Sequence, residues 1–318
     1  MPGRLCSGRA FFRLGASGSA GETGDEVHVP RSGAAATAMI ALRYFLPAPD
    51  LRRYISSYYL FRADLPIVTD LVRADLAQIR FMIQGSGVYE FAGGASAETP
   101  RVSLIGPTMA ASHFTVLGPV LVFGASLLPT GWAAAVREDA NLLVHCVDDA
   151  AARLGPVLGD ALDAMAGSPT AETMVSIADS ALRAVFARAV DPPLWFTRGM
   201  EAWLTDAASP SVDALIARSG MSARQLARLA NRIYGAPPKL LSRKYRALRA
   251  ATQLCEASGD WFGAVGEAFY DQPHFIREVK RFTGLTPRQY RENPPPVTRL
   301  MLQRRGFAAQ LPRIAVVR

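Results

Sequence analysis

The apolar and polar positions between Ser211 and Glu292 follow one pattern twice. A shift of 49 positions places the second half of this stretch on the first, with apolar, basic and helix-breaking positions in the same order. Two copies are too few for a solenoid, so the pattern predicts a duplicated supersecondary unit. The matched pairs are Leu226 and Phe275, Ala227 and Ile276, Arg228 and Arg277, Arg232 and Arg281, Ile233 and Phe282, Gly235 and Gly284, and Pro238 and Pro287.

The first copy is predicted to be two short helices joined by a tight turn. Apolar residues recur at helical spacing from Val212, directly after Ser211, which belongs to the residue types that cap helix N-termini. Gly220 supplies the turn, and Ser222 caps a second helix. That helix ends at Gly235, because glycine tolerates the left-handed conformation found at helix C-termini.

The second copy repeats this layout, with one helix from Trp261 to Phe269 and another between Asp271 and Gly284. In both copies the second helix buries apolar residues and carries basic residues on its open face, which is typical of a helix-turn-helix. The residues predicted to be buried are Leu226, Leu229 and Ile233 in the first copy, and Phe275, Val279 and Phe282 in the second.

A third predicted helix joins the two copies. Pro238 suits a first helical turn, and apolar residues then keep helical spacing to about Ser258. Some twenty residues at 1.5 Å per residue span roughly 30 Å. B-DNA makes one turn in roughly 34 Å, so this linker could place two recognition helices in successive major grooves. One chain could then read two half-sites without dimerising.

The run GMSARQLARLANRIYGAPPKLLSRKYRALRAA, followed by FYDQPHFIREVKRFTGLTPRQYR, resembles the DNA-binding domain of AraC/XylS-type transcriptional regulators. The resemblance covers both helix-turn-helix copies, the linker helix and the closing TP-x-x-YR segment. The family usually has Phe at the positions of Ala230 and Val279 and often Ser at that of Pro273. These departures affect core volume and a helix cap.

The resemblance implies which residues bind DNA. Arg224 and Arg228 would face the first major groove, and Gln272, His274 and Arg277 the second. Arg can pair with guanine, and Gln with adenine, through two hydrogen bonds each. The implied phosphate contacts are Arg232, Lys244, Arg246, Lys280 and Arg281, and Ala227 and Pro273 complete the predicted DNA-binding set.

The sequence from Ile40 to about Arg137 is rich in short β-type segments separated by turn residues, which suggests a small sandwich or open barrel. The resemblance likewise implies a cupin-like β-barrel that senses a small molecule. The candidate strands are Tyr54–Phe61, Ile79–Ile83, Val88–Phe91, Val102–Ile105, Phe114–Leu117 and Leu121–Leu128. Six residues are candidates to line a ligand pocket, although for each of them alone a core or surface position is the commoner role: Tyr59, Arg80, Phe81, Tyr89, His113 and Trp132.

Helices are predicted over Ala150–Met165 and Ala171–Ala189, either as a dimer seam or packed on their own barrel. Asp191–Pro193 blocks helix continuation and marks a domain boundary, and Trp195–Leu204 opens the next domain. The predicted fold class is therefore α+β in two domains: a β-barrel or sandwich with flanking helices, then an all-α double helix-turn-helix domain.

The predicted division is residues 39–190 for the sensor domain and 193–293 for the DNA-binding domain. Residues 1–38, rich in Gly, Ala and Ser, are predicted to be disordered, and Met39 is an alternative start. Residues 294–318 are predicted to be a mobile basic tail that follows the Pro294–Pro296 run.

The charge distribution agrees with a DNA partner. The formal net charge is +8, and residues 211–293 hold 14 Lys or Arg against 7 Asp or Glu, whereas residues 39–210 hold 12 against 17. A basic domain joined to an acidic one suits a protein whose basic part meets phosphate. The three cysteines are scattered and His113 stands alone among the strands, so no metal, other cofactor or disulfide is expected.

These observations predict a cytoplasmic, sequence-specific transcription factor that is not an enzyme and has no membrane span. Its predicted partners are double-stranded DNA, RNA polymerase, a small effector and a second copy bound through the N-terminal domain. Two alternatives stay open: a sensor or interaction protein with a degenerate DNA-binding domain, and a DNA-modifying enzyme targeted by this domain.

Overall fold

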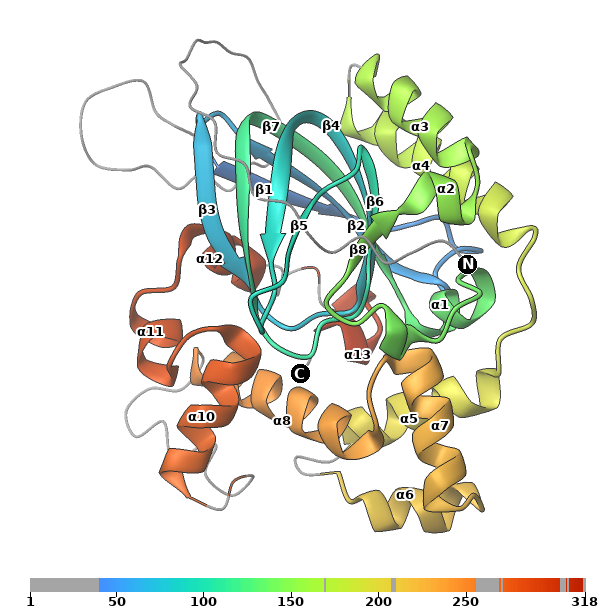
Figure 1. Ribbon diagram of the computed structural model, residues 1–318, viewed down its shortest axis with the longest axis vertical. Coiled ribbons are helices and arrows are strands. Elements are labelled where there is room, and N and C mark those ends of the chain that lie inside the picture. Colours follow the sequence, from blue (N-terminus) through green and yellow to red (C-terminus); the bar gives the residue numbers. More distant parts are fainter. Residues whose placement is uncertain are drawn as a thin grey trace.

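The computed structural model describes residues 40–168, 170–206, 210–255, 269, 271–303, 307 and 309–316. An antiparallel sheet with covering helices forms one half, and a set of helices beneath it forms the other (Figure 1). The α+β fold class predicted from the sequence is thereby confirmed. The predicted disordered extension, and the predicted helix from Trp261 except its last residue, lie outside the described residues.

Eight strands make one sheet in which every pairing is antiparallel. The order is β1-β2-β7-β4-β6-β8, with β3 paired to β7 and β5 to β4. The strands are β1 Ile40–Phe45, β2 Ile55–Ala63, β3 Ile67–Val72, β4 Ala77–Glu90, β5 Ser96–Glu98, β6 Val102–Ile105, β7 Ser112–Leu127 and β8 Val147–Asp149.

The two longest strands, β4 and β7, correct the sequence prediction, which divided each of them into two. Turn-forming residues inside them do not end the strands, because β4 and β7 pair along almost their whole length and bend together. The register shifts between Met82 and Ser86, where Gly85 has a positive φ of 88°. A bulge at this point bends the strand without ending its ladder. Strands β1, β3, β5 and β8 were not among the predicted strands.

The helices differ from the prediction chiefly at one proline. The predicted helix over Ala150–Met165 is broken at Gly155 and Pro156 into two helices, as expected where proline cannot continue a helix. The helices are α1 Pro129–Ala135, the 3-10 helix η1 Ala140–Leu142, α2 Ala150–Leu154, α3 Val157–Ala166, α4 Ala171–Phe186, α5 Leu194–Asp206, α6 Val212–Ser219, α7 Ala223–Tyr234, α8 Pro238–Leu254, α10 Gln272–Thr283, α11 Pro287–Glu292, α12 Pro296–Gln303 and α13 Arg313–Val316.

Two hydrophobic cores lie on the two sides of the sheet. On one side, α1 to α4 bury their apolar faces against β2, β4, β6 and β7, around Trp132 and Phe123. On the other side, the sheet curves around a second core that includes Phe61, Phe114 and Val122. The apolar faces of α3 and α4 are therefore used within their own domain.

The C-terminal segment completes this second core, so the prediction of a mobile tail is wrong for the described residues 296–303. Helix α12 packs on β1 and β3 through Val297 and Leu300. The buried Asp70 carboxylate on β3 accepts a hydrogen bond of 2.8 Å from the backbone N–H of Val297. The Pro294–Pro296 run ends the preceding helix, but the apolar residues after it are enough to hold a new helix on the sheet.

The helices of the lower half share a core with the sheet domain. Apolar residues of α5, α6, α7 and α8 cluster with Ala74, Leu76, Met109 and Leu128 of the sheet domain, while α8, α10 and α11 surround Phe275 together with Leu71 of β3. Backbone N–H groups of Ala74 and Ala111 donate to the last-turn carbonyls of Phe282 and Arg281 in α10. The two halves therefore pack on each other through both apolar and hydrogen-bonded contacts.

Lys244, predicted to contact phosphate, lies in this junction instead. Its side chain on α8 is 2% exposed, and its Nζ donates to the backbone oxygens of Asp75 at 2.8 Å and Thr108 at 2.9 Å. Burial lowers the pKa of Lys244 to about 7, despite the opposing charge of Asp75 and with a further lowering by Arg73. The phosphate contact is therefore wrong for Lys244 in this arrangement, because its amine is enclosed by the sheet domain.

We expect Lys244 to make the stability of the folded chain depend on pH. Between the folded pKa of about 7 and the ordinary value of 10.5, the unfolded chain holds this proton more tightly than the folded chain. Stability therefore rises with pH in that window, by up to about 1.4 kcal/mol per pH unit. Melting temperatures measured from pH 7.5 to 9.5 should rise more steeply with pH for the natural chain than for Lys244→Met.

The control is Lys239→Met, because Lys239 lies in the first turn of the same helix, α8, and its side chain is exposed. This variant should keep the pH slope of the natural chain. Parallel pH profiles for the natural chain and Lys244→Met would contradict the lowered pKa of a buried amine at this position.

Candidate nucleic-acid interface and barrel pocket

Helix α7, which the sequence predicts to be the first recognition helix, begins with a reciprocal cap. Ser222 Oγ accepts from the backbone N–H of Gln225, and the Ser222 backbone N–H donates to Gln225 Oε1 at 3.0 Å. Leu226 and Ile233 are buried as the helical spacing predicts, whereas the third predicted residue, Leu229, is half-buried and Ala230 is buried instead. The opposite face exposes the side chains of Arg224, Arg228 and Arg232, with Ala227 half-buried.

Helix α10, which the sequence predicts to be the second recognition helix, has the same length as α7 and the same place in the repeat. Asp271 caps it by accepting from the backbone N–H of His274 at 2.6 Å, and Phe275, Val279 and Phe282 are buried. Its exposed residues include five of the predicted set, namely Gln272, Pro273, Arg277, Lys280 and Arg281, while His274 is half-buried against the ring of Phe269. The cap, helix bounds and terminal glycine of α7 recur 49 positions later.

Helix α8 connects the two units and is tied to α10 by an ion pair that the sequence analysis missed. Arg243 donates from Nε to Glu278 Oε2 at 2.9 Å and from Nη2 to Glu278 Oε1 at 2.7 Å. Burial opposes ionisation of Glu278, but the hydrogen bonds and charge of Arg243 outweigh it and hold the pKa below its usual value. A bidentate pair of this kind fixes orientation as well as distance. The residues stand 35 positions apart, so no helical spacing indicates their contact.

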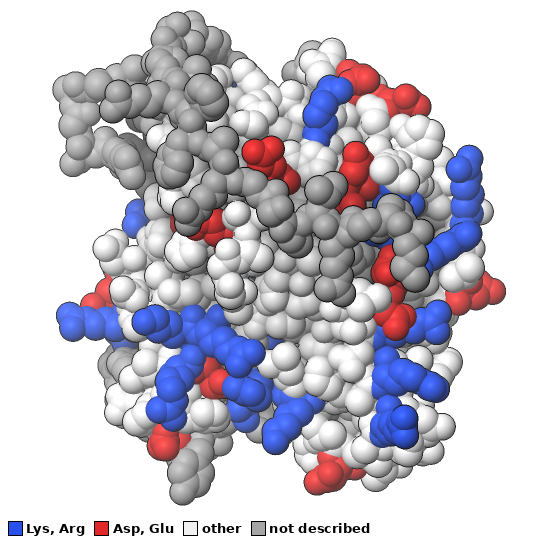
Figure 2. All heavy atoms as spheres, in the orientation of Figure 1, with Lys and Arg blue, Asp and Glu red and all other residues white. Residues whose placement is uncertain are grey.

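Arg246, the other α8 residue in the predicted set, is half-buried. Its guanidinium lies 4.9 Å from the centre of the Phe269 ring. With Lys244 enclosed, the described residues of the predicted set that present exposed basic side chains are those of α7 and α10. Figure 2 shows Lys and Arg gathered over the two sides of the lower half, where Figure 1 places α7 and α10.

A cleft separates the open face of α7 from the η1 loop of the sheet domain. Arg224, Ala227 and Arg228 line one side, and Asp139 and Asn141 line the other. The Asp139 carboxylate lies 3.6 Å from Arg232 Nε, with both side chains more than half exposed. The acidic loop therefore stands beside the basic face of the first recognition helix.

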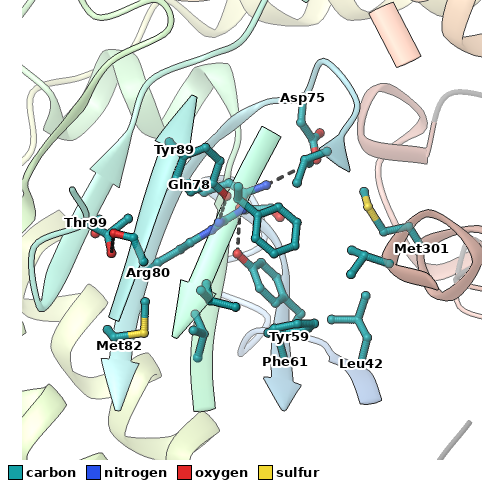
Figure 3. Close-up of a pocket in the computed structure, with 18 of the residues that line it drawn as sticks. Leu42, Tyr59, Phe61, Asp75, Gln78, Arg80, Met82, Tyr89, Thr99 and Met301 are labelled. Atoms are coloured by element: carbon teal, nitrogen blue, oxygen red, sulfur yellow. Dashed lines mark hydrogen bonds between the residues drawn. The ribbon is translucent and has the colours of Figure 1, made fainter. Parts of the chain in front are cut away.

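A pocket opens inside the curved sheet, on the side closed by α12. It encloses about 850 Å³ of empty space, counting solvent at its mouth. Tyr59, Arg80 and Tyr89 line it as predicted (Figure 3). Val297 and Met301 of α12 also line it, and no local sequence pattern indicated that a segment so distant in the chain would reach the barrel.

The other three predicted pocket residues do not line this pocket. Phe81 and Trp132 are buried in the core on the opposite side of the sheet, and the Trp132 indole donates to the carbonyl of Glu138 at 3.1 Å. His113 is exposed on β7. An alternation of one residue along a strand moves a side chain from one face to the other, which places Arg80 and Phe81 on opposite sides.

The polar groups of the pocket are joined through Gln78, which the sequence analysis missed. Gln78 Oε1 accepts from the Tyr59 hydroxyl at 2.7 Å and from Arg80 at 2.9 Å (Nε) and 2.7 Å (Nη2). Gln78 Nε2 donates to the Asp75 carboxylate at 3.3 Å, and Arg80 Nη1 donates to the Tyr89 hydroxyl. The rest of the lining is mostly apolar, so this network is the charged and hydrogen-bonded part of the pocket, with Thr99 as a separate polar residue (Figure 3).

Within the described part of the chain, no three or more His, Cys, Asp or Glu side chains are grouped to hold a metal ion. The described helices include none that is both long enough and apolar enough to cross a membrane.

A helix-turn-helix domain family matches residues 215–293. Curated protein sequences give no match. Among solved structures, ToxT from Vibrio cholerae in an apo form is similar, with 11% identity, 79% of this chain and 96% of that chain covered, and a TM-score of 0.43.

Two further structures are similar over smaller or less closely superposed regions. The AraC-like transcriptional activator CuxR is 14% identical over 70% of this chain and 85% of its own, with a TM-score of 0.30. A cupin-like protein from Thermotoga maritima is 15% identical over 32% of this chain and 80% of its own, with a TM-score of 0.20. With the domain match on residues 215–293, the chain carries a C-terminal helix-turn-helix domain of the AraC type, which is the DNA-binding domain of a transcription regulator.

Proposed function

We propose that this chain reads two successive major grooves with α7 and α10 and that a small effector in the barrel pocket regulates its binding. The observation that carries the proposal is the structural repeat. Arg228 and Arg277 occupy equivalent exposed positions on two equally long helices, and both helices pack on the same linker helix. A single chain can then supply two reading helices where a single-copy helix-turn-helix needs a dimer.

The proposed division of roles follows from position on these helices. Arg224, Arg228, Gln272 and Arg277 lie on the exposed faces toward the N-terminal ends, from which recognition helices contact base edges. Arg232, Lys280 and Arg281 lie in the last turns and suit phosphate contacts. Arg246 stays in the proposed phosphate set, and Lys244 is removed from it because its amine is enclosed.

The proposed regulation is supported by the loop between β3 and β4, which belongs to both the pocket and the junction. The side chain of Asp75 lines the pocket, and its backbone oxygen accepts from Lys244 of α8. The neighbouring Ala74 N–H donates to Phe282 of α10 at 2.7 Å. An effector that shifts this loop would move the Asp75 carbonyl that accepts from the linker helix and the Ala74 N–H that donates to the second recognition helix.

The proposed partners also include RNA polymerase and a second copy of the chain. Because α3 and α4 bury their apolar faces on their own sheet, a dimer through this domain would use their outer faces. Such a dimer would add avidity to the reading unit within one chain.

Arg228→Ala and Arg277→Ala should each lower affinity for the cognate site by about 1–3 kcal/mol and relax the base preference at one half-site. Arg232→Ala should weaken all sequences nearly equally and reduce the salt dependence. Binding to a panel of single-base operator variants at two salt concentrations distinguishes these effects. Arg101→Ala, which removes an exposed arginine from the sheet domain, is the control. It should change neither the affinity for the cognate site nor the base preference. An unchanged ranking of variants for Arg228→Ala would exclude its base-reading role.

Footprinting of the full chain should show two protected major grooves per bound chain, about one helical turn apart on one face of the DNA. The stoichiometry is measured by sedimentation on a duplex that carries one site. Binding only as two chains on a palindrome, with one groove protected by each, would contradict the proposal of a reading unit within one chain.

Asp139→Asn should raise affinity for operator DNA about two- to fivefold at low salt. The carboxylate lies beside Arg232 and would face the phosphates that approach α7, and exposed pairs of this kind contribute about 0.2–1 kcal/mol. Asp163→Asn on α3 is the matched control, because it removes an exposed acid far along the sheet domain. Equal effects of the two variants would mean that only total charge matters.

A further inference from the structure

Arg80 is held among neutral partners in the middle of the barrel pocket. Its guanidinium donates to the Gln78 amide and the Tyr89 hydroxyl, and lies 5.8 Å from the Tyr59 ring centre and 5.1 Å from that of Tyr89 (Figure 3). None of the ion pairs among the described residues includes Arg80. The group is thus fixed in orientation without a carboxylate that balances its charge.

The contacts leave one N–H free on each terminal nitrogen. A guanidinium has five N–H groups; Nε and Nη2 donate to Gln78, and Nη1 donates to Tyr89. The second N–H of Nη1 and that of Nη2 have no acceptor among the described residues. Two such groups, one on each terminal nitrogen, are the donors with which Arg binds a carboxylate in bidentate fashion.

The neighbouring acidic groups do not supply the missing negative charge. Burial raises the pKa of Tyr59 to about 12, although Arg80 opposes that rise, so Tyr59 is neutral near pH 7. Asp75 accepts from the backbone N–H of Leu76 and from Gln78, whose amide stands between Asp75 and Arg80. Asp75 also makes the pocket unfavourable for a ligand with more than one negative charge.

Beyond the polar patch the lining is mostly apolar, with Thr99, Ser103 and Ser126 as further polar residues, and the apolar residues come from two distant parts of the chain. Leu42, Phe61, Met82 and Val122 come from the sheet, and Val297 and Met301 come from α12. The apolar walls are suited to a hydrocarbon or aromatic body, and the polar patch offers one place for a charged end.

We infer that the barrel pocket binds a monocarboxylate with an apolar body, whose carboxylate accepts both free N–H groups of Arg80 while its body lies between the sheet and α12. The inference rests on the proposal that this pocket is the effector site, and it adds the chemical class of the effector. Arg80 selects the charge and α12 contacts the body.

The test measures binding to the full chain by calorimetry without DNA, using probes that share one body and differ in the end group. Octanoate, octan-1-ol, octylammonium and octyl phosphate form such a set. Octanoate should bind about tenfold or more tightly than the alcohol, because hydrogen bonds to a charged partner exceed neutral ones. Arg80→Met should remove the preference for octanoate over octan-1-ol.

Three further variants separate the contributions. Arg80→Lys keeps the positive charge but cannot donate two parallel hydrogen bonds to a carboxylate. The preference for octanoate over octan-1-ol should therefore fall but persist. Thr99→Val is the matched control, because Thr99 lines the pocket but donates to the carbonyl of Gly87; the preference should be unchanged. Met301→Ala should weaken octanoate and octan-1-ol by the same factor, because it shortens the apolar wall only.

Equal affinity for octanoate and octan-1-ol would overturn the inference, as would tighter binding of octylammonium or octyl phosphate, or no binding of any probe. These outcomes leave the DNA-binding proposal untouched, because no DNA is present. If octanoate binds through Arg80 but does not change affinity for operator DNA, the ligand class stands and the proposed effector role fails.

Discussion

Both recognition helices end where the sheet domain leaves little room for a side chain. Gly235 and Gly284 close α7 and α10 with φ of 81° and 80°. A Cβ on Gly235 would lie 2.7 Å from the Val144 side chain, and one on Gly284 would lie 3.1 Å from Cβ of Ala111. Glycine satisfies the left-handed conformation and the close approach together. The helices thereby dock by their C-terminal ends, and the first turn of α7 is separated from the η1 loop of the sheet domain by the cleft.

The recognition helices were predictable from the sequence because their ends are set by local residues, whereas the contact between the two domains was not. Caps and breakers act over three or four residues, so Ser222, Asp271 and the two glycines predicted both recognition helices from the sequence. The repeat also matched the start of α8 with that of α11, 49 positions on. Lys244 was misassigned, because a basic residue at a helical spacing does not reveal whether a second domain will cover it.

The sheet was predicted less well, because its strands depend on partners far along the chain. Gly and Pro within β4 and β7 mark turns in a local reading, yet mutual pairing carries the ladder across them. For the pocket, the alternation along β4 decides that Arg80 faces inward and Phe81 faces the opposite core, and a one-residue error in register exchanges them. Gln78 and Met301 carried no local signal, because one acts through hydrogen bonds to distant residues and the other arrives from the end of the chain.

The pocket and the helix junction share the loop between β3 and β4 and helix α12, so a ligand in the pocket would meet elements that also contact the DNA-binding half. A ligand changes an equilibrium only if it binds two states with different affinity. Arg80 alone cannot supply that difference if the barrel is rigid, because its partners Gln78 and Tyr89 belong to the same strand. Helix α12 can supply this difference in affinity, because it contributes Val297 and Met301 to the pocket and follows α10 and α11 directly in the chain. The apolar body of a ligand, more than its charged end, would therefore carry the regulatory free energy, by favouring the state in which α12 is seated on the barrel.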